Sequence, residues 1–138
     1  MKLYTIGYGG RSPVQFLDML RTHSIRTVVD VRLRPDRSSM GVFAQAKDPQ
    51  KGIQRLLATA GIEYVSFIEM GNMFIGIPDW ARRYRQLIER AGDLLTQQLD
   101  QVREPACLMC AEKRAADCHR SILAEYLTGQ GHMVEHLE

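Results

Sequence analysis

The segment ACLMCAEKRAADCHRSILAEYL, residues 106–127, reads in order as a buried strand, a polar loop and an amphipathic helix. Ala106–Cys110 is an unbroken apolar run that predicts the strand, and Ala111–Ala116 predicts the loop. Asp117–Arg120 open the helix, in which apolar residues recur at helical spacing. The first N–H groups of a helix lack internal partners and the helix dipole is positive there, so this arrangement predicts an anion site.

The same alternation of strand and helix patterns runs along the rest of the chain. Strands are expected over Leu3–Ile6, Ile25–Val31, Ile62–Ile68 and His132–Leu137. Helices are expected after Ser12-Pro13, after Asp48-Pro49 and from Pro78, at capping or helix-starting residues. We therefore expect an α/β fold of three layers, with a mostly parallel five-stranded sheet, helices on both faces, and a single domain over residues 1–138.

Composition restricts the class of protein. With 138 residues, 45% hydrophobic and 25% charged, the chain matches an ordinary globular domain and is long enough to bury a core. A net charge of +2 is too small to predict nucleic-acid binding from bulk charge. The sequence has no apolar run of membrane-spanning length and no leader pattern at its start, and it contains three cysteines. We expect a cytoplasmic protein with reduced thiols and no membrane association.

A parallel sheet gathers the candidate ligand-binding residues. Ligands bind beyond the carboxyl ends of parallel strands, where Gly7–Arg11, Asp30–Arg37, Glu69–Asn72 and Cys110–Arg120 should meet. The candidates for ligand binding at this edge are Gly7, Tyr8, Arg11, Asp30, Arg32 and Arg120. The prediction requires that Asp30, Cys110 and Arg120 surround a common hollow.

Structural alternatives exist for several of these candidates. The glycines of Gly7–Gly10 can serve only to make a turn. Asp30 and Arg32 flank the last apolar residue of their strand on the same side and can pair with each other. The arginines of residues 32–37 can grip phosphate or simply be solvated.

Four residues are candidates for catalysis: Cys110, Glu112, Cys118 and His119. Cys107 points to the opposite face of its strand from Cys110 and is expected to be a packed hydrophobe. Cys118 lies at a helix start, where N–H groups and cations favour a thiolate, whereas Cys110 is favoured by its position at a strand end. Glu112 and His119 can act as acid and base, and the alternative is inert packing beside a structural polar network.

A metal site is not expected. Cys107, Cys110, Cys118 and His119 supply four possible ligands, but the first two point to opposite faces of a strand. Cys118 and His119 diverge by about 100° around a helix, which makes tetrahedral closure awkward. We therefore expect no metal and no cofactor.

Several motifs resemble the DUF488 family, a domain of unknown function. They are Thr5-Ile6-Gly7, Val29-Asp30-Val31-Arg32, Tyr64, Cys110-Ala111-Glu112-Lys113 and Cys118-His119-Arg120. The resemblance covers essentially the whole chain and implies a compact α/β domain, but it supplies no settled activity. One departure is that the family usually has a histidine and a serine where this chain has Tyr8-Gly9.

A weaker resemblance points to rhodanese-like sulfurtransferases and related cysteine phosphatases. Both have a strand that ends in cysteine before an anion-binding loop and a helix. The phosphatase spacing would require arginine at position 116, where this chain has Ala116.

The leading functional hypothesis is a small enzyme that binds a phosphate-bearing small molecule or nucleic-acid end and uses the Cys/His/Glu/Arg cluster. One alternative is a sulfurtransferase or phosphatase-like enzyme. The other is a non-catalytic module that binds phosphate or nucleic acid through Arg34, Arg37 and the arginines of residues 82–90. The oligomeric state is left open.

Overall fold

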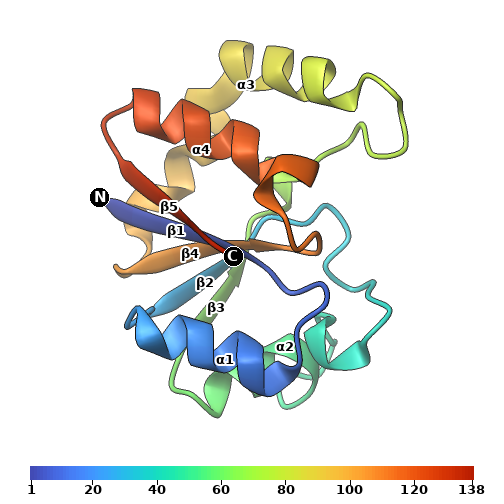
Figure 1. Ribbon diagram of the computed structural model, residues 1–138, viewed down its shortest axis with the longest axis vertical. Helices are drawn as coiled ribbons and strands as arrows, with labels where there is room; N and C mark the ends of the chain where they lie inside the picture. Colours follow the sequence, from blue (N-terminus) through green and yellow to red (C-terminus); the bar gives the residue numbers. More distant parts are fainter.

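A computed structural model describes residues 1–138 and shows a sheet of five parallel strands (Figure 1). The strands lie in the order β3-β2-β4-β1-β5. Their bounds are β1 Lys2–Gly7, β2 Thr27–Asp30, β3 Glu63–Ser66, β4 Ala106–Cys110 and β5 Met133–Leu137. The predicted α/β class and five-stranded sheet are confirmed, and the predicted strand 106–110 matches β4 residue for residue.

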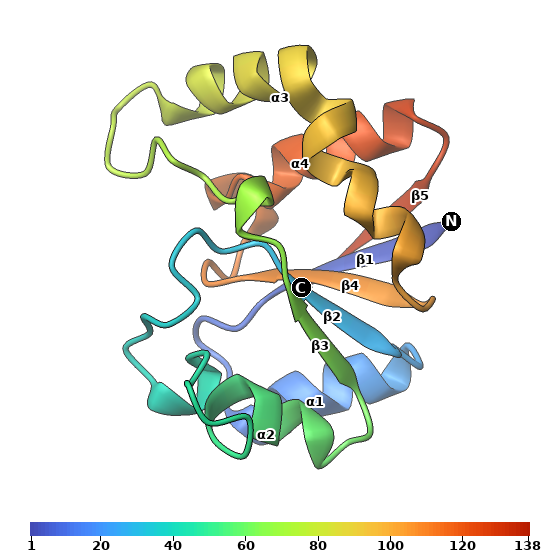
Figure 2. The ribbon, with the colours of Figure 1, turned by 180° about the vertical axis from the view of Figure 1, so that it is seen from behind.

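Two helices cover each face of the sheet, and both views show the same three layers (Figures 1 and 2). One face carries α1 (Pro13–Thr22) and α2 (Gly52–Ala58). The other carries α3 (Trp80–Thr96) and α4 (Arg120–Gly129). Short 3-10 helices are η1 Gly41–Phe43, η2 Ile68–Met70, η3 Gln97–Gln101 and η4 Ala115–Asp117. None of the helices has the length and apolar character needed to cross a bilayer.

The central strand β4 divides the core into two halves. Leu108 and Cys110 pack toward α3 and α4, whereas Cys107 and Met109 pack toward α1 and α2. All five residues of β4 are buried, which explains why its sequence is apolar without alternation. Cys107 is a buried free thiol, as predicted, and burial raises its pKa.

The helix starts agree with the sequence in one case and differ in three. Ser12 and Gln15 form the predicted capping box before α1. Asp48 does not cap α2, which begins at Gly52; its carboxylate accepts the Gln50 N–H in a turn instead. Likewise α3 begins two residues after Pro78, at Trp80, and α4 begins at Arg120 because η4 and an extended Cys118 precede it.

The long connections lie on the side to which the strands point. The segments after β2 and before α3 both extend from that edge (Figures 1 and 2). The carboxyl edge of the sheet is therefore surrounded by irregular segments.

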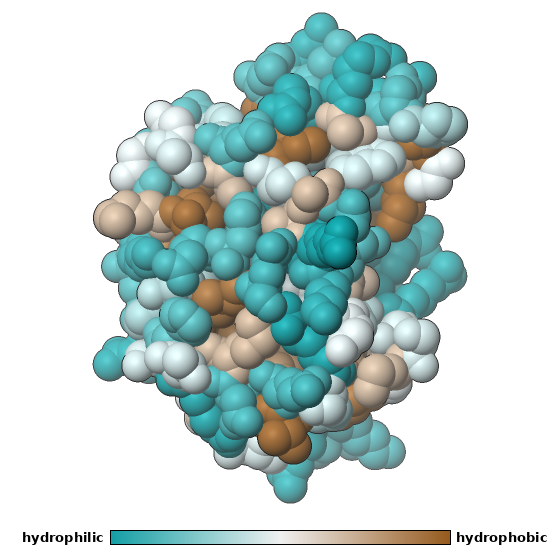
Figure 3. Space-filling view, in the orientation of Figure 1, coloured by the Kyte–Doolittle hydropathy of each residue, from teal (hydrophilic) through white to brown (hydrophobic).

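The face seen in Figure 3 is mainly hydrophilic, with separate hydrophobic patches. Exposed large apolar residues within residues 68–77 are Ile68, Met73, Ile75 and Ile77.

Candidate functional site

A cavity of about 310 Å³ lies at the carboxyl edge of the sheet. Its walls come from the end of β1, the segment after β2, the segment before α3, and the β4–α4 connection. It is lined by six of the ten predicted site residues: Tyr8, Arg32, Cys110, Glu112, Cys118 and His119. The other four, Gly7, Arg11, Asp30 and Arg120, do not line it. The predicted hollow thus has Cys110 on its wall, while Asp30 and Arg120 lie behind that wall.

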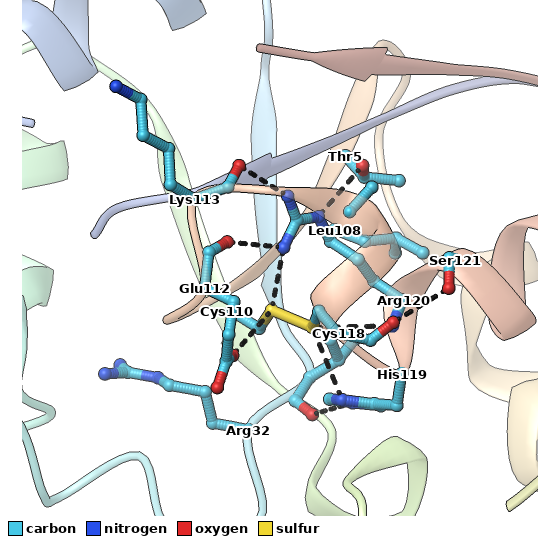
Figure 4. Close-up of a disulfide and its surroundings, with 12 residues drawn as sticks. Thr5, Arg32, Leu108, Cys110, Glu112, Lys113, Cys118, His119, Arg120 and Ser121 are labelled. Atoms are coloured by element: carbon cyan, nitrogen blue, oxygen red, sulfur yellow. Dashed lines mark hydrogen bonds between the residues drawn. A yellow bond between two sulfur atoms is a disulfide. The ribbon is translucent and has the colours of Figure 1, made fainter. Parts of the chain in front are cut away.

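Cys110 and Cys118 are joined as a disulfide at the cavity (Figure 4). The expectation of reduced thiols is therefore wrong for this pair in the structure. The turn η4 folds the loop back, so that Cys118 in extended conformation lies beside the last residue of β4. The spacing of the two residues in the sequence does not reveal this fold-back.

Arg120 is fully buried, and its guanidinium is directed at the wall of the site (Figure 4). Nε donates to Thr5 Oγ1 at 3.2 Å, and Nη1 lies 3.1 Å from Cys110 Sγ. Nη1 and Nη2 also donate to the carbonyl oxygens of Glu112 (2.7 Å) and Lys113 (3.0 Å). None of these partners is a carboxylate, and burial lowers the pKa of Arg120. Arg120 therefore ties the loop to β1 and β4 and keeps a cation beside the sulfur.

Asp30 and Arg32 form the pair that the sequence offered as a structural alternative. Arg32 Nε and Nη2 donate to the two Asp30 carboxylate oxygens at 2.9 and 2.7 Å. The Tyr64 hydroxyl donates to Asp30 Oδ2 at 2.6 Å, and burial, with the charge of Asp30, raises the pKa of Tyr64. Asp30 is fully buried, while Arg32 lines the cavity against the Tyr8 ring. The Arg32 charge is therefore largely compensated before a ligand arrives.

His119 is held in one orientation beside Cys118. Its Nε2 lies 2.9 Å from the Val31 carbonyl oxygen, which can only accept, so Nε2 carries the proton. Nδ1 then presents a lone pair 3.5 Å from Cys118 Sγ. Burial, with a further contribution from the positive Arg120, lowers the pKa of His119 to about 4. The imidazole is therefore neutral at pH 7, and its basic atom faces a sulfur.

The glycines after β1 allow the β4–α4 loop to approach the backbone. A Cβ on Gly7 would lie 1.6 Å from the Glu112 carbonyl oxygen, and one on Gly9 would lie 2.5 Å from that of Ala111. The Gly9 N–H donates to the same Ala111 oxygen at 2.8 Å. These glycines therefore position the loop that carries the site.

Arg11 lies away from the cavity. Its Nε donates to the Gly7 carbonyl oxygen at 2.8 Å, and Nη2 reaches the Leu137 and Glu138 carbonyl oxygens. The guanidinium holds the end of β1 to the end of β5.

The cavity is also lined by residues outside the ten candidates for the enzyme site. Arg34 and Arg37 are exposed on its wall and form no ion pair with an acidic side chain. Trp80 is half-buried and shares the lining with Ile75 and Asn72. The sequence placed Asp30–Arg37 and Glu69–Asn72 at this sheet edge and offered Arg34 and Arg37 as phosphate-binding residues, but it did not indicate that Ile75 and Trp80 line the cavity.

One group of side chains has the composition of a metal-binding set. The ligand atoms of Cys110, Glu112 and Cys118 lie within 4.8 Å of one another. This set differs from the four residues considered in the sequence, since Cys107 is buried on the other face and His119 is outside it. Because the two sulfurs are bonded to each other, the set offers no thiolate pair in this state.

Comparison with known proteins identifies the family. The family described as "Domain of unknown function DUF488" matches residues 12–127. No curated protein and no solved structure matched the chain. The matched residues include β2, β3, β4 and most of α4, and with them the cysteine pair and His119. The chain therefore belongs to the DUF488 family.

Proposed function

We propose that this protein is a thiol enzyme that binds a phosphate-bearing ligand in the cavity, with Cys110 as the nucleophile. The observation that carries the proposal is the Arg120 guanidinium, fully buried and 3.1 Å from Cys110 Sγ, with no carboxylate bonded to it. A buried cation without a charged partner is costly. In the reduced protein, a Cys110 thiolate supplies that partner, so Arg120 favours the nucleophilic form of the thiol.

Glu112 acts against this effect, but only weakly. Its carboxylate lies 3.7 Å from Cys110 Sγ, and a second negative charge there disfavours a thiolate. Glu112 is exposed, whereas the Arg120 guanidinium is enclosed, so solvent screens the carboxylate more than the cation. Glu112 is also placed to exchange protons with a ligand in the cavity.

The cavity wall supports binding of an anion that carries an apolar group. Arg34 and Arg37 provide two cations that no acidic side chain neutralises, and guanidinium groups bind phosphate oxygens well. Ile75 and Trp80 provide an apolar surface beside them. A nucleotide or a nucleic-acid end combines these two chemical features.

Trp80 makes binding directly measurable. It is the only tryptophan in the chain and it lines the cavity, so ligands there should change its fluorescence. Adenosine monophosphate is expected to quench this signal, and Arg34→Ala with Arg37→Ala should weaken binding at least about tenfold. Arg55→Ala is the matched control, because Arg55 is exposed on α2, which covers the other face of the sheet.

Alkylation of the reduced protein tests the nucleophile. Iodoacetamide should react with Cys110 at a pH midpoint below about 8.5, the ordinary value for a thiol, and Cys110→Ser should remove this reaction. Binding of the nucleotide without a reactive thiol would instead identify a non-catalytic binding module. That module would depend chiefly on Arg34 and Arg37, because Arg82, Arg83 and Arg85 are paired with acidic side chains.

One observation favours sulfur transfer as a second candidate. The phosphatase spacing lacks its arginine at Ala116, yet Arg120 reaches Cys110 at the end of the central strand from α4. A thiolate so placed can accept a sulfane sulfur atom. Incubation of the reduced Cys118→Ser variant with thiosulfate should then add one sulfur to Cys110 and release sulfite, and an unchanged protein mass would eliminate this candidate.

A further inference from the structure

We propose that Cys110 and Cys118 form a reversible dithiol–disulfide couple that reduces small anionic disulfides. Cys110 attacks the substrate, and Cys118 resolves the mixed disulfide that results. The inference rests on the proposed function for its nucleophile, Cys110. It adds a second catalytic thiol and a class of oxidant, the low-molecular-weight disulfides.

The charge around the bonded pair makes Cys110 the attacking sulfur. In the disulfide form, Arg120 has two carbonyl oxygens, a hydroxyl and a neutral sulfur as partners. Reduction places a thiolate 3.1 Å from this buried cation and so compensates its charge. The charge of Arg120 therefore favours the thiolate of reduced Cys110, which attacks a disulfide at neutral pH, and an excess of the substrate disulfide drives the pair to its oxidised form.

Cys118 has its own activating groups. The Nδ1 atom of His119, fixed as a proton acceptor by the Val31 carbonyl, lies 3.5 Å from Cys118 Sγ. The backbone N–H of Arg120, in the first turn of α4, also points at this sulfur at 3.5 Å. One group can take the thiol proton and the other can stabilise the thiolate, as a resolving cysteine requires.

The cavity gives small molecules access to both cysteines. Cys110 and Cys118 are only 1% and 2% exposed, yet both sulfur-bearing residues line the cavity. A small molecule can enter there, whereas a disulfide on the surface of a folded protein cannot reach the sulfurs. Arg34 and Arg37 on the wall favour a substrate with negative charge.

The exchange balances in two steps. The Cys110 thiolate attacks one sulfur of the substrate disulfide, forming a mixed disulfide and releasing one thiolate. Cys118 then gives its proton to His119 Nδ1 and attacks Cys110 Sγ, which forms the Cys110–Cys118 bond and releases the second thiolate. That thiolate takes the proton, so one protein thiolate and one protein thiol are oxidised to the disulfide while the substrate disulfide is reduced to one thiolate and one thiol.

The test uses dithiodipropionate, a small dianionic disulfide, added to the reduced, folded full chain and followed by intact mass after acid quenching. Wild type should lose two hydrogens without a lasting adduct, whereas Cys118→Ser and Cys118→Ala should each keep one adduct on Cys110. Cys110→Ser should react at least about tenfold more slowly, because Arg120 does not contact Cys118 through its guanidinium. Cys107→Ser should behave as wild type, since Cys107 lies in the other half of the core.

Two further outcomes separate this inference from the proposed function. An adduct that persists equally in wild type and Cys118→Ser would overturn the resolving role and leave Cys110 as the nucleophile. A failure of reduced Cys110 to react with iodoacetamide would overturn the proposed function itself. Cystamine, a dicationic disulfide of similar size, should react at least about tenfold more slowly than dithiodipropionate, and equal rates would overturn the preference for anions.

Discussion

The Arg120 guanidinium and the Cys110 sulfur lie 3.1 Å apart, although one begins a helix and the other ends the central strand. Arg120 also donates to two carbonyl oxygens of the loop between them. One side chain thus fixes the shape of the loop and the electrostatic surroundings of the thiol. The stability of the loop and the reactivity of Cys110 should therefore respond together when Arg120 is changed.

Replacing Arg120 with methionine should destabilise the protein by about 3 kcal/mol or more, because the Thr5 hydroxyl and two loop carbonyls lose a buried donor. Arg120→Lys should cost less and should retain part of the proposed thiolate reactivity of reduced Cys110. Urea unfolding and the pH profile of alkylation measure the two effects. If the wild type, Arg120→Lys and Arg120→Met all showed the same pH profile of alkylation, the electrostatic role of Arg120 would be contradicted.

Gly7→Ala should destabilise the protein by at least about 2 kcal/mol, since the added Cβ would meet the Glu112 carbonyl oxygen at 1.6 Å. The loop must then shift, and the Cys110–Arg120 contact should weaken with it. Gly41→Ala is the control because a Cβ there meets nothing within 4 Å. Thermal melts of both variants test the prediction, and similar melting temperatures would show that the loop is not held this closely.

Stability should fall as the pH decreases from about 6.5 to about 4. His119 titrates near 4 in the folded protein and near 6.5 when unfolded, so the unfolded chain binds the extra proton in this window. The full effect is about 3 kcal/mol. His136, whose pKa is also lowered by burial, contributes in the same direction. Urea unfolding across this range should show a flatter profile for His119→Asn, and an unchanged profile would exclude His119 as its source.

Tyr64→Phe should destabilise the protein by about 1.5–3 kcal/mol, because the Asp30 carboxylate loses a hydrogen bond in a fully buried position. Asp30→Ala should cost more, about 3–5 kcal/mol, since it leaves the Arg32 charge buried without its partner. Tyr126→Phe is the matched control, because the bond of Tyr126 to Asp93 lies at the surface. Denaturant unfolding should show the largest loss of stability for Asp30→Ala, a smaller loss for Tyr64→Phe and the smallest for Tyr126→Phe, and a larger loss for the control would contradict this prediction.

Much of the architecture was predictable because local rules and global packing agree. The unbroken apolar run of β4 identifies a strand buried on both faces, and Ser12 with Gln15 forms the capping box that the sequence indicates. The start of α2 was mispredicted because Asp48 satisfies a turn as well as it could cap a helix.

The candidate site was less predictable than the fold. Residue types at the strand ends indicated which segments meet, but not which side chains face a ligand. In the sequence, Arg120 looks like a residue that binds an anion. In the structure, the β4–α4 loop packs closely against the Gly7 backbone, and its carbonyl oxygens lie within hydrogen-bond distance of the Arg120 guanidinium. Trp80 fits a core stripe by periodicity, and only the path of the preceding segment brings it to the cavity.

The loop between β4 and α4 is held through its main chain. Arg120 binds the carbonyl oxygens of Glu112 and Lys113, and Gly9 binds that of Ala111, so the side chains of these three residues do not hold the loop in place. Substitutions there can alter what enters the cavity without rebuilding the frame that supports the two sulfurs. Ala111 and Glu112 line the cavity, so a substitution at either position changes the cavity surface and keeps the hydrogen bonds that shape the loop.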